Sequence, residues 1–173
     1  SPNDRFQPEY LEQLYLNDDI AARICDLVPS EMLRQGFSIK VDDEDFVWEG
    51  LSDILRDVLV KARIFGAAFI YIGADDGQAQ EQGLSLTKIR GVRFLNVLSP
   101  KDLSHQSFFG DAQQANFGQP ELYRLNNSRQ YQSTAIHSSR LIPFFGTPPL
   151  NSRQFPPSIL QRIYPVLQQF HTA

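Results

Sequence analysis

The feature that most constrains this chain is an amphipathic helical segment that leads directly into an apolar strand bounded by glycines. Residues 51–64 place apolar side chains at helical spacing, and Asp57 and Lys61 lie on the opposite face. Residues 66–73 are apolar, aromatic or glycine throughout, which predicts a central strand buried on both faces. The helical stripe consists of Leu51, Ile54, Leu55, Val58, Leu59 and Ala62. This pair of segments predicts helices packed on a sheet.

Two further helices are expected on either side of this unit. Asn17, Asp18 and Asp19 offer N-capping side chains for a helix that begins near Ile20, and Pro29 is expected to limit that helix. A closing helix over residues 159–170, kinked by Pro165, follows Ser158 as its N-cap. Residues 146–157 form a Pro-rich link to that helix.

Shorter strands are predicted in the second half of the chain. Their ranges are residues 91–98, 121–125 and 139–142, with an earlier short strand at residues 37–41. Residues 102–119 have no clear period and are interpreted as a long irregular loop. Because helices come first and strands later, we expect a single α+β domain over residues 1–173, with amphipathic helices packed on a small mixed β-sheet.

Composition excludes several classes of protein. The chain has one cysteine and three scattered histidines, so neither an internal disulfide nor a zinc site is expected, and Cys25 is interpreted as a buried small hydrophobe. No phosphate-binding glycine loop occurs, and no cofactor is expected. The longest apolar run, residues 64–72, is far shorter than the roughly 20 residues that span a bilayer.

The two ends suggest that the sequence belongs to a longer polypeptide. It opens with Ser1 and Pro2 rather than methionine, and it stops at Ala173 directly after a strongly helical run. We therefore expect a fragment of a larger protein.

Charge is divided unequally between the two halves of the chain. Residues 1–86 hold 7 basic and 17 acidic residues, whereas residues 87–173 hold 9 basic and 3 acidic ones. A net charge of −4 argues against a protein that mainly coats DNA. The bipolar pattern fits either intramolecular packing of the halves or head-to-tail contacts between copies. The candidate contact residues are Asp42, Asp43, Glu44, Asp45, Arg124 and Arg140.

The tract of residues 42–45 lacks the alternating ligands of an EF-hand. It is interpreted as a solvated loop or a helix start.

Two H-x-S triplets form the one pattern that is typical of an enzyme. They are His105 to Ser107 and His137 to Ser139. Two-histidine phosphoesterases use two H-x-[ST] motifs, in which one histidine is the base, the other is the acid and the hydroxyls hold the phosphate. So short a pattern recurs often in a Ser-rich chain, and turn or capping roles for these hydroxyls are the alternative.

Four strings, in order, resemble the N-terminal region of tailed-phage portal proteins of the anti-CBASS-like portal family. They are IAARICDLVPSEMLRQGFSI (20–39), ARIFGAAFIYIG (62–73), FLNVLSP (94–100) and IHSSRLI (136–142). The resemblance implies a portal wing-like domain, the N-terminal part of a subunit in a ring of about twelve copies around a DNA channel. Such a ring is a virion head-to-tail connector that is built in the host bacterial cytoplasm.

The same resemblance implies a structural role without catalysis. A connector nucleates the procapsid, docks the terminase, contacts capsid or scaffold proteins, passes DNA without sequence preference and binds tail adaptors; it contacts no membrane. Some relatives join this region to a two-histidine phosphodiesterase that destroys cyclic-nucleotide immune signals. The alternative function is therefore an anti-CBASS protein that acts on cyclic nucleotides through His105, Ser107, His137 and Ser139.

Overall fold

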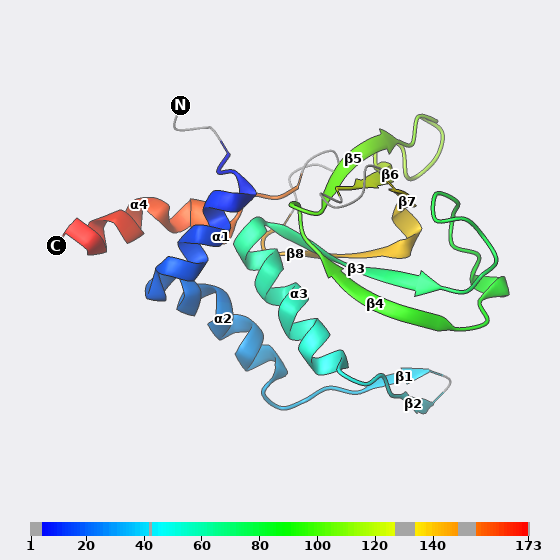
Figure 1. Ribbon diagram of the computed structural model, residues 1–173, viewed down its shortest axis with the longest axis horizontal. Coiled ribbons are helices and arrows are strands. Elements are labelled where there is room, and N and C mark those ends of the chain that lie inside the picture. Colours follow the sequence, from blue (N-terminus) through cyan, green and yellow to red (C-terminus); the bar gives the residue numbers. More distant parts are fainter. Residues whose placement is uncertain (1–4, 42, 127–133, 149–154, 173) are drawn as a thin grey trace.

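The computed structural model describes residues 5–41, 43–126, 134–148 and 155–172 (Figure 1). Within those ranges lie the helices α1 (Pro8–Asn17), α2 (Asp19–Leu33), α3 (Leu51–Phe65) and α4 (Ile159–Thr172). Two 3₁₀ turns, η1 (Leu86–Lys88) and η2 (Ser138–Arg140), punctuate the second half. Helices α1, α2 and α4 gather at one end and the longer strands extend from α3 toward the other. The predicted α+β class is confirmed.

The strands in the described ranges form two three-stranded sheets and a small hairpin. Strand β3 (Ala67–Ala74) is the centre of the sheet β4-β3-β8, between β4 (Val92–Leu98) and β8 (Leu141–Phe145). The second sheet has the order β5-β6-β7, with β5 (Leu103–Phe108), β6 (Pro120–Leu125) and β7 (Thr134–His137). Strands β1 (Ile39–Val41) and β2 (Glu44–Phe46) pair with each other.

All the pairings among the described strands are antiparallel, which corrects the expectation of one mixed sheet. No α-helix lies between consecutive paired strands in the described ranges, and parallel neighbours need a crossover that is usually helical. The irregular loop expected over residues 102–119 was also wrong in part. Its first residues form β5, because pairing with β6 outweighs their weak strand propensity.

Strand β3 is the middle layer of the molecule. Ala68 and Ile70 on one of its faces pack against Val58 and Ala62 of α3. Side chains on its other face, including Phe69, pack against the second sheet. The prediction of a strand buried on both faces is therefore confirmed. Pro143 lies in β8, an edge strand, where a missing backbone N–H is tolerated.

The remaining helices bury a separate apolar cluster. Leu11, Ala21, Cys25, Leu160 and Leu167 form its centre, together with the end of α3. Cys25 is fully buried, and burial raises the pKa of its thiol to about 12, which agrees with a packing role.

Capping and proline chemistry define the ends of these helices. The Asp18 carboxylate accepts hydrogen bonds from the backbone N–H groups of Ile20 and Ala21, as the N-cap prediction requires. Helix α2 runs through Pro29 to Leu33, so the expected limit at Pro29 was wrong. Burial of the Pro29 ring in the helical bundle offsets the one hydrogen bond that proline removes.

The turn between α3 and β3 depends on Gly66. Its φ is +92°, and a Cβ there would overlap the carbonyl oxygen of Pro156 in the link that leads to α4. Gly36 is also left-handed, with φ +74°, but a Cβ there would meet no atom within 4 Å.

We therefore expect Gly66→Ala to destabilise the protein much more than the matched control Gly36→Ala. Gly36→Ala should lower the free energy of unfolding by about 1–2 kcal/mol, the cost of a left-handed alanine. Gly66→Ala must also displace the Pro156 backbone. Urea unfolding of both variants measures the difference. Equal losses of stability would show that the link does not hold this turn.

Candidate functional site

One cavity of about 630 Å³ collects the histidines of both H-x-S triplets. His105 comes from β5, His137 ends β7 and Ser139 lies in η2, so strands that are distant in sequence bring them together. The apolar and aromatic lining residues are Phe69, Phe109, Pro120, Tyr123, Leu141, Pro143, Phe145 and Phe155. The polar lining residues are His105, Asn116, Gln119, His137, Ser138 and Ser139.

His137 is held by a short local hydrogen-bond network. Its Nδ1 accepts the backbone N–H of Ser139 at 3.2 Å and lies 2.8 Å from the Ser139 hydroxyl oxygen. That hydroxyl also accepts the backbone N–H of Leu84 at 2.8 Å, so its proton is directed to the ring. Nδ1 is therefore an acceptor and the ring proton resides on Nε2. Burial lowers the pKa of His137, which keeps the ring neutral near pH 7.

His105 occupies an aromatic environment. Its ring centroid lies 4.5 Å from that of Phe155 and 5.2 Å from that of Tyr123. Tyr123 and Phe155 are themselves nearly parallel, at 9° between their planes. Burial lowers the pKa of His105, because an apolar surrounding disfavours the imidazolium. Both histidines of the pair are thus neutral groups in an apolar cavity.

Ser107 departs from the two-motif arrangement. It does not line the cavity, and its hydroxyl donates a long hydrogen bond of 3.5 Å to the Glu121 carboxylate. The structure therefore brings together three of the four residues that the paired motif predicted.

The wall that carries His137 is anchored by a buried ion pair. The Arg140 guanidinium donates to both carboxylate oxygens of Asp76, at 3.3 and 3.0 Å, and to the carbonyl oxygen of Gln82 at 3.0 Å. Both side chains of the pair are fully buried. The backbone N–H of Ser85, with the Arg140 guanidinium, lowers the pKa of Asp76 to about 2.

Arg140 was wrong as a candidate contact between copies. A guanidinium enclosed with its own carboxylate partner has no surface to present to a neighbouring molecule. Its sequence context, an arginine just after a Ser pair, gave no sign of burial.

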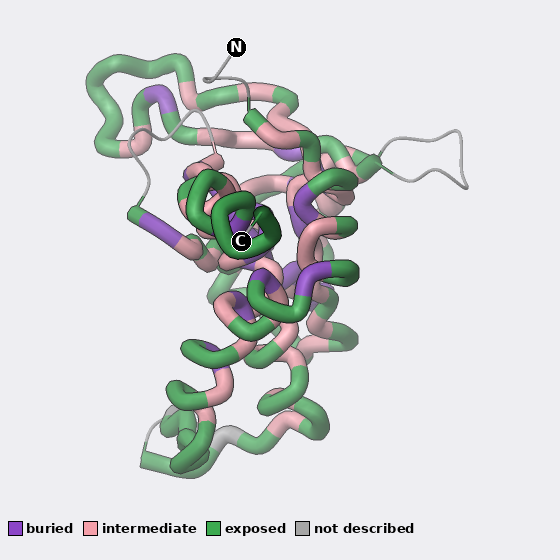
Figure 2. The backbone as a smooth tube through the Cα atoms, turned by 90° about the vertical axis from the view of Figure 1, so that its left-hand side faces the viewer, coloured by how far each residue is buried: buried purple, intermediate pink, exposed green. Residues whose placement is uncertain are grey.

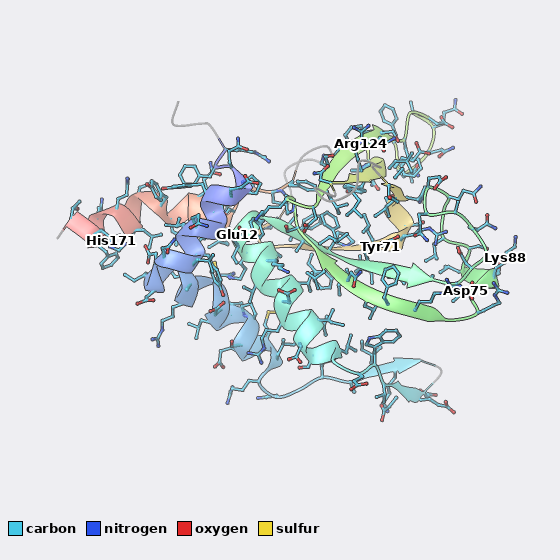
Figure 3. The ribbon with its side chains drawn as sticks, in the orientation of Figure 1. Glu12, Tyr71, Asp75, Lys88, Arg124 and His171 are labelled. Carbon is cyan, nitrogen blue, oxygen red and sulfur yellow. The ribbon has the colours of Figure 1, made fainter. Side chains whose placement is uncertain are left out.

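The other candidate contact residues lie on the surface. Asp43, Glu44 and Asp45 are exposed at the β1–β2 hairpin, while Asp42 lies outside the described residues. Glu44 and Asp45 begin β2 rather than a helix, and Asp43 lies in the turn before it with a left-handed backbone, φ +67°. Arg124 is exposed on β6, and Figure 3 places it on the side of the molecule opposite the hairpin.

Two structural findings bear on cofactors and membranes. Among the described residues, no group of three or more His, Cys, Asp or Glu side chains is placed to hold a metal ion. The described helices include none with both the length and the apolar character needed to cross a bilayer.

Comparison with known proteins now places the chain in a family. A family model described as phage portal protein matches residues 9–173. The chain belongs to the phage portal protein family. It is also similar to a protein named anti-CBASS protein Acb1 from Caulobacter sp. (strain RHG1), with 25% identity over 182 residues. That match covers 96% of this chain and 29% of the relative, so the chain spans less than a third of that protein's length.

Several cavity residues of this portal-family chain carry no motif. Phe109, Asn116, Gln119 and Phe155 lie in segments without a regular period. The only sequence signal for their position was the aromatic side chains in those segments, which favour packing against the core.

Removing one partner of the buried pair should be costly. We expect Arg140→Met to lower the free energy of unfolding by about 3–5 kcal/mol, because it leaves the Asp76 carboxylate buried and unpaired. The matched surface change Arg56→Met, at an exposed position of α3, should stay within about 0.5 kcal/mol. Urea unfolding at pH 7 measures both.

The same pair predicts an acid dependence. The folded-state pKa of Asp76 lies below its ordinary value of 3.8, so the pair contributes stability above about pH 4 that is lost as pH falls toward 2. Equal free energies of unfolding for Arg140→Met and Arg56→Met would show that the buried pair does not anchor this wall of the cavity.

Proposed function

We propose that this chain is the N-terminal, wing-like part of a portal subunit and that it contributes contacts to a portal ring. The observation that carries the proposal is the match to the portal family over residues 9–173. In this role the ring serves procapsid assembly, DNA packaging and ejection. Its partners are further copies of itself, the terminase, capsid or scaffold proteins and tail adaptors, and DNA passes through it without sequence recognition. The ring is located in the host bacterial cytoplasm during assembly and then in the virion.

The positions of the charged surfaces support head-to-tail contacts. Figure 3 places Arg124 on the side of the molecule opposite the acidic hairpin, and the views in Figures 1 and 2 separate the hairpin from the second sheet. Neither Glu44 nor Asp45 forms an ion pair with another described residue. One copy's hairpin can therefore meet the next copy's β6, and such a heterologous contact closes into a ring when the rotation allows.

An apolar face on α2 supports burial of this end of the molecule. Large side chains stand exposed along the helix, with Leu27 at 53% and Met32 at 62% of their full exposure. Ile20, seven residues before Leu27, lies on the same side of the helix as Leu27 and is 40% exposed, and Val28 is 43% exposed. Large apolar side chains that gather on an exposed element are typical of an interface. We assign this face to a neighbouring copy in the ring.

A charge swap tests the assembly contact. We expect the chain to form rings or concentration-dependent oligomers, as measured by light scattering and negative-stain imaging. Asp45→Arg should weaken association about tenfold, and adding Arg124→Asp in the same chain should restore it, because each contact then regains opposite charges. Glu81→Lys, another exposed acidic site, is the matched control and should leave association unchanged.

If the chain stays monomeric at all concentrations, the assembly contacts do not lie within these residues. Loss of association without rescue in the double variant would reject the hairpin-to-β6 contact and leave the α2 face to be tested alone, by Leu27→Glu.

We also infer that the cavity does not cleave phosphodiesters. Three observations support this inference: Ser107 lies outside the lining, both histidines are neutral, and none of the described lining residues is lysine or arginine. Cleavage of a phosphodiester needs positive groups on the developing charge.

Incubation with cyclic dinucleotides should therefore give no linear product, as followed by chromatography. Linear product that disappears in both His105→Ala and His137→Ala would instead establish the two-histidine phosphodiesterase function. Product that persists in both variants would indicate a contaminant.

A further inference from the structure

The cavity between the two sheets has the form of a binding site whose ligand is uncharged. Its volume of about 630 Å³ falls in the range of small-molecule sites, roughly 300–1,000 Å³. Among its described lining residues none is lysine, arginine, aspartate or glutamate, and its two histidines are neutral near pH 7. A charged group placed here would lose its hydration without a counter-charge.

Aromatic rings line the cavity and can stack against a flat ligand. Tyr123 and Phe155 are nearly parallel, with ring centroids 6.5 Å apart. Phe109, from the loop after β5, lines the cavity beside His137, with the two rings nearly perpendicular at 73° and 6.0 Å apart. Planar heterocycles stack on such rings.

Side-chain amides at the same cavity have hydrogen-bonding capacity to spare. Asn116 and Gln119 use their backbone groups in the loop, where Gln119 N–H donates to the Asn116 carbonyl and its own carbonyl accepts from Phe109. Their side-chain amides have no hydrogen-bond partner among the described residues. Each amide offers a donor and an acceptor side by side, the pattern that pairs with the edge of a purine base.

We propose that this cavity binds an uncharged nucleobase, stacked on Phe109 or Phe155 and held at its edge by Asn116 and Gln119. The absence of basic side chains from the described lining favours a nucleoside over a phosphorylated form. His137, with its ring proton on Nε2, supplies a further donor at the cavity wall. The proposal rests on the cavity alone, and nucleoside binding is measured independently of ring assembly.

Calorimetric titration of the whole chain with adenosine is the first test. We expect saturable binding, with AMP binding no more tightly than adenosine because nothing in the lining pairs with its phosphate. Indole, a planar ring without the acceptors of a purine edge, should bind at least about tenfold more weakly. A single-stranded oligo(dA) probe distinguishes a free nucleoside from a base within a strand.

Variants then assign the contacts. The double change Asn116→Ala and Gln119→Ala should weaken adenosine binding about tenfold or more, whereas Gln113→Ala, in the same loop but outside the lining, should not. Phe109→Ala should weaken it similarly, with Phe117→Ala as the matched control on the exposed side of the loop. Circular dichroism confirms that each variant is folded.

Several outcomes would overturn the proposal. No binding at millimolar adenosine rejects it outright, without any variant. Equal affinities for indole and adenosine would reduce the site to an apolar cavity without base recognition. Tighter binding of AMP or oligo(dA) than of adenosine would reject the uncharged nucleoside in favour of a phosphorylated ligand. Equal effects of the lining and control variants would place adenosine elsewhere on the chain.

Discussion

The structure depends above all on the burial of both faces of β3. Ala68 and Ile70 on one face pack against α3, while Phe69 and Tyr71 on the other pack against the second sheet. A single strand thereby joins a helical layer to a second sheet that has no helix of its own in the described ranges. The cavity lies where Phe69 contacts Tyr123 and Phe155, and all three side chains line it.

A buried ion pair then gives the cavity a fixed wall. Arg140 and Asp76 are both enclosed, and each has its hydrogen-bonding groups satisfied by the other or by backbone. A charged pair is tolerated in the interior only when it is so fully paired. Because Arg140 ends the same 3₁₀ turn that holds Ser139, fixing the guanidinium also fixes the hydroxyl that orients His137.

The cavity holds neutral side chains, whereas the charged side chains proposed for assembly lie on the surface. His105 and His137 share a sequence pattern with paired catalytic histidines, yet apolar surroundings keep both neutral. The exposed charges of Glu44, Asp45 and Arg124 lie outside the cavity, on strands β2 and β6, which lie on opposite sides of the molecule in Figure 1. The proposed assembly contact and the proposed ligand site therefore lie on different parts of the molecule.

The sequence by itself determined the elements whose signals are local. The α3 stripe, the apolar run of β3 and the capping side chains of Asp18 and Ser158 act within a few residues, and all were predicted. Helix α1 and strands β5 and β7 were missed, since their weak propensities are decided by partners far along the chain.

Only the tertiary structure decided that Pro29 stays inside a helix, that Arg140 is buried, and that His105 and His137 share one cavity. In each case the deciding energy comes from a contact between distant segments, and no local pattern contains it.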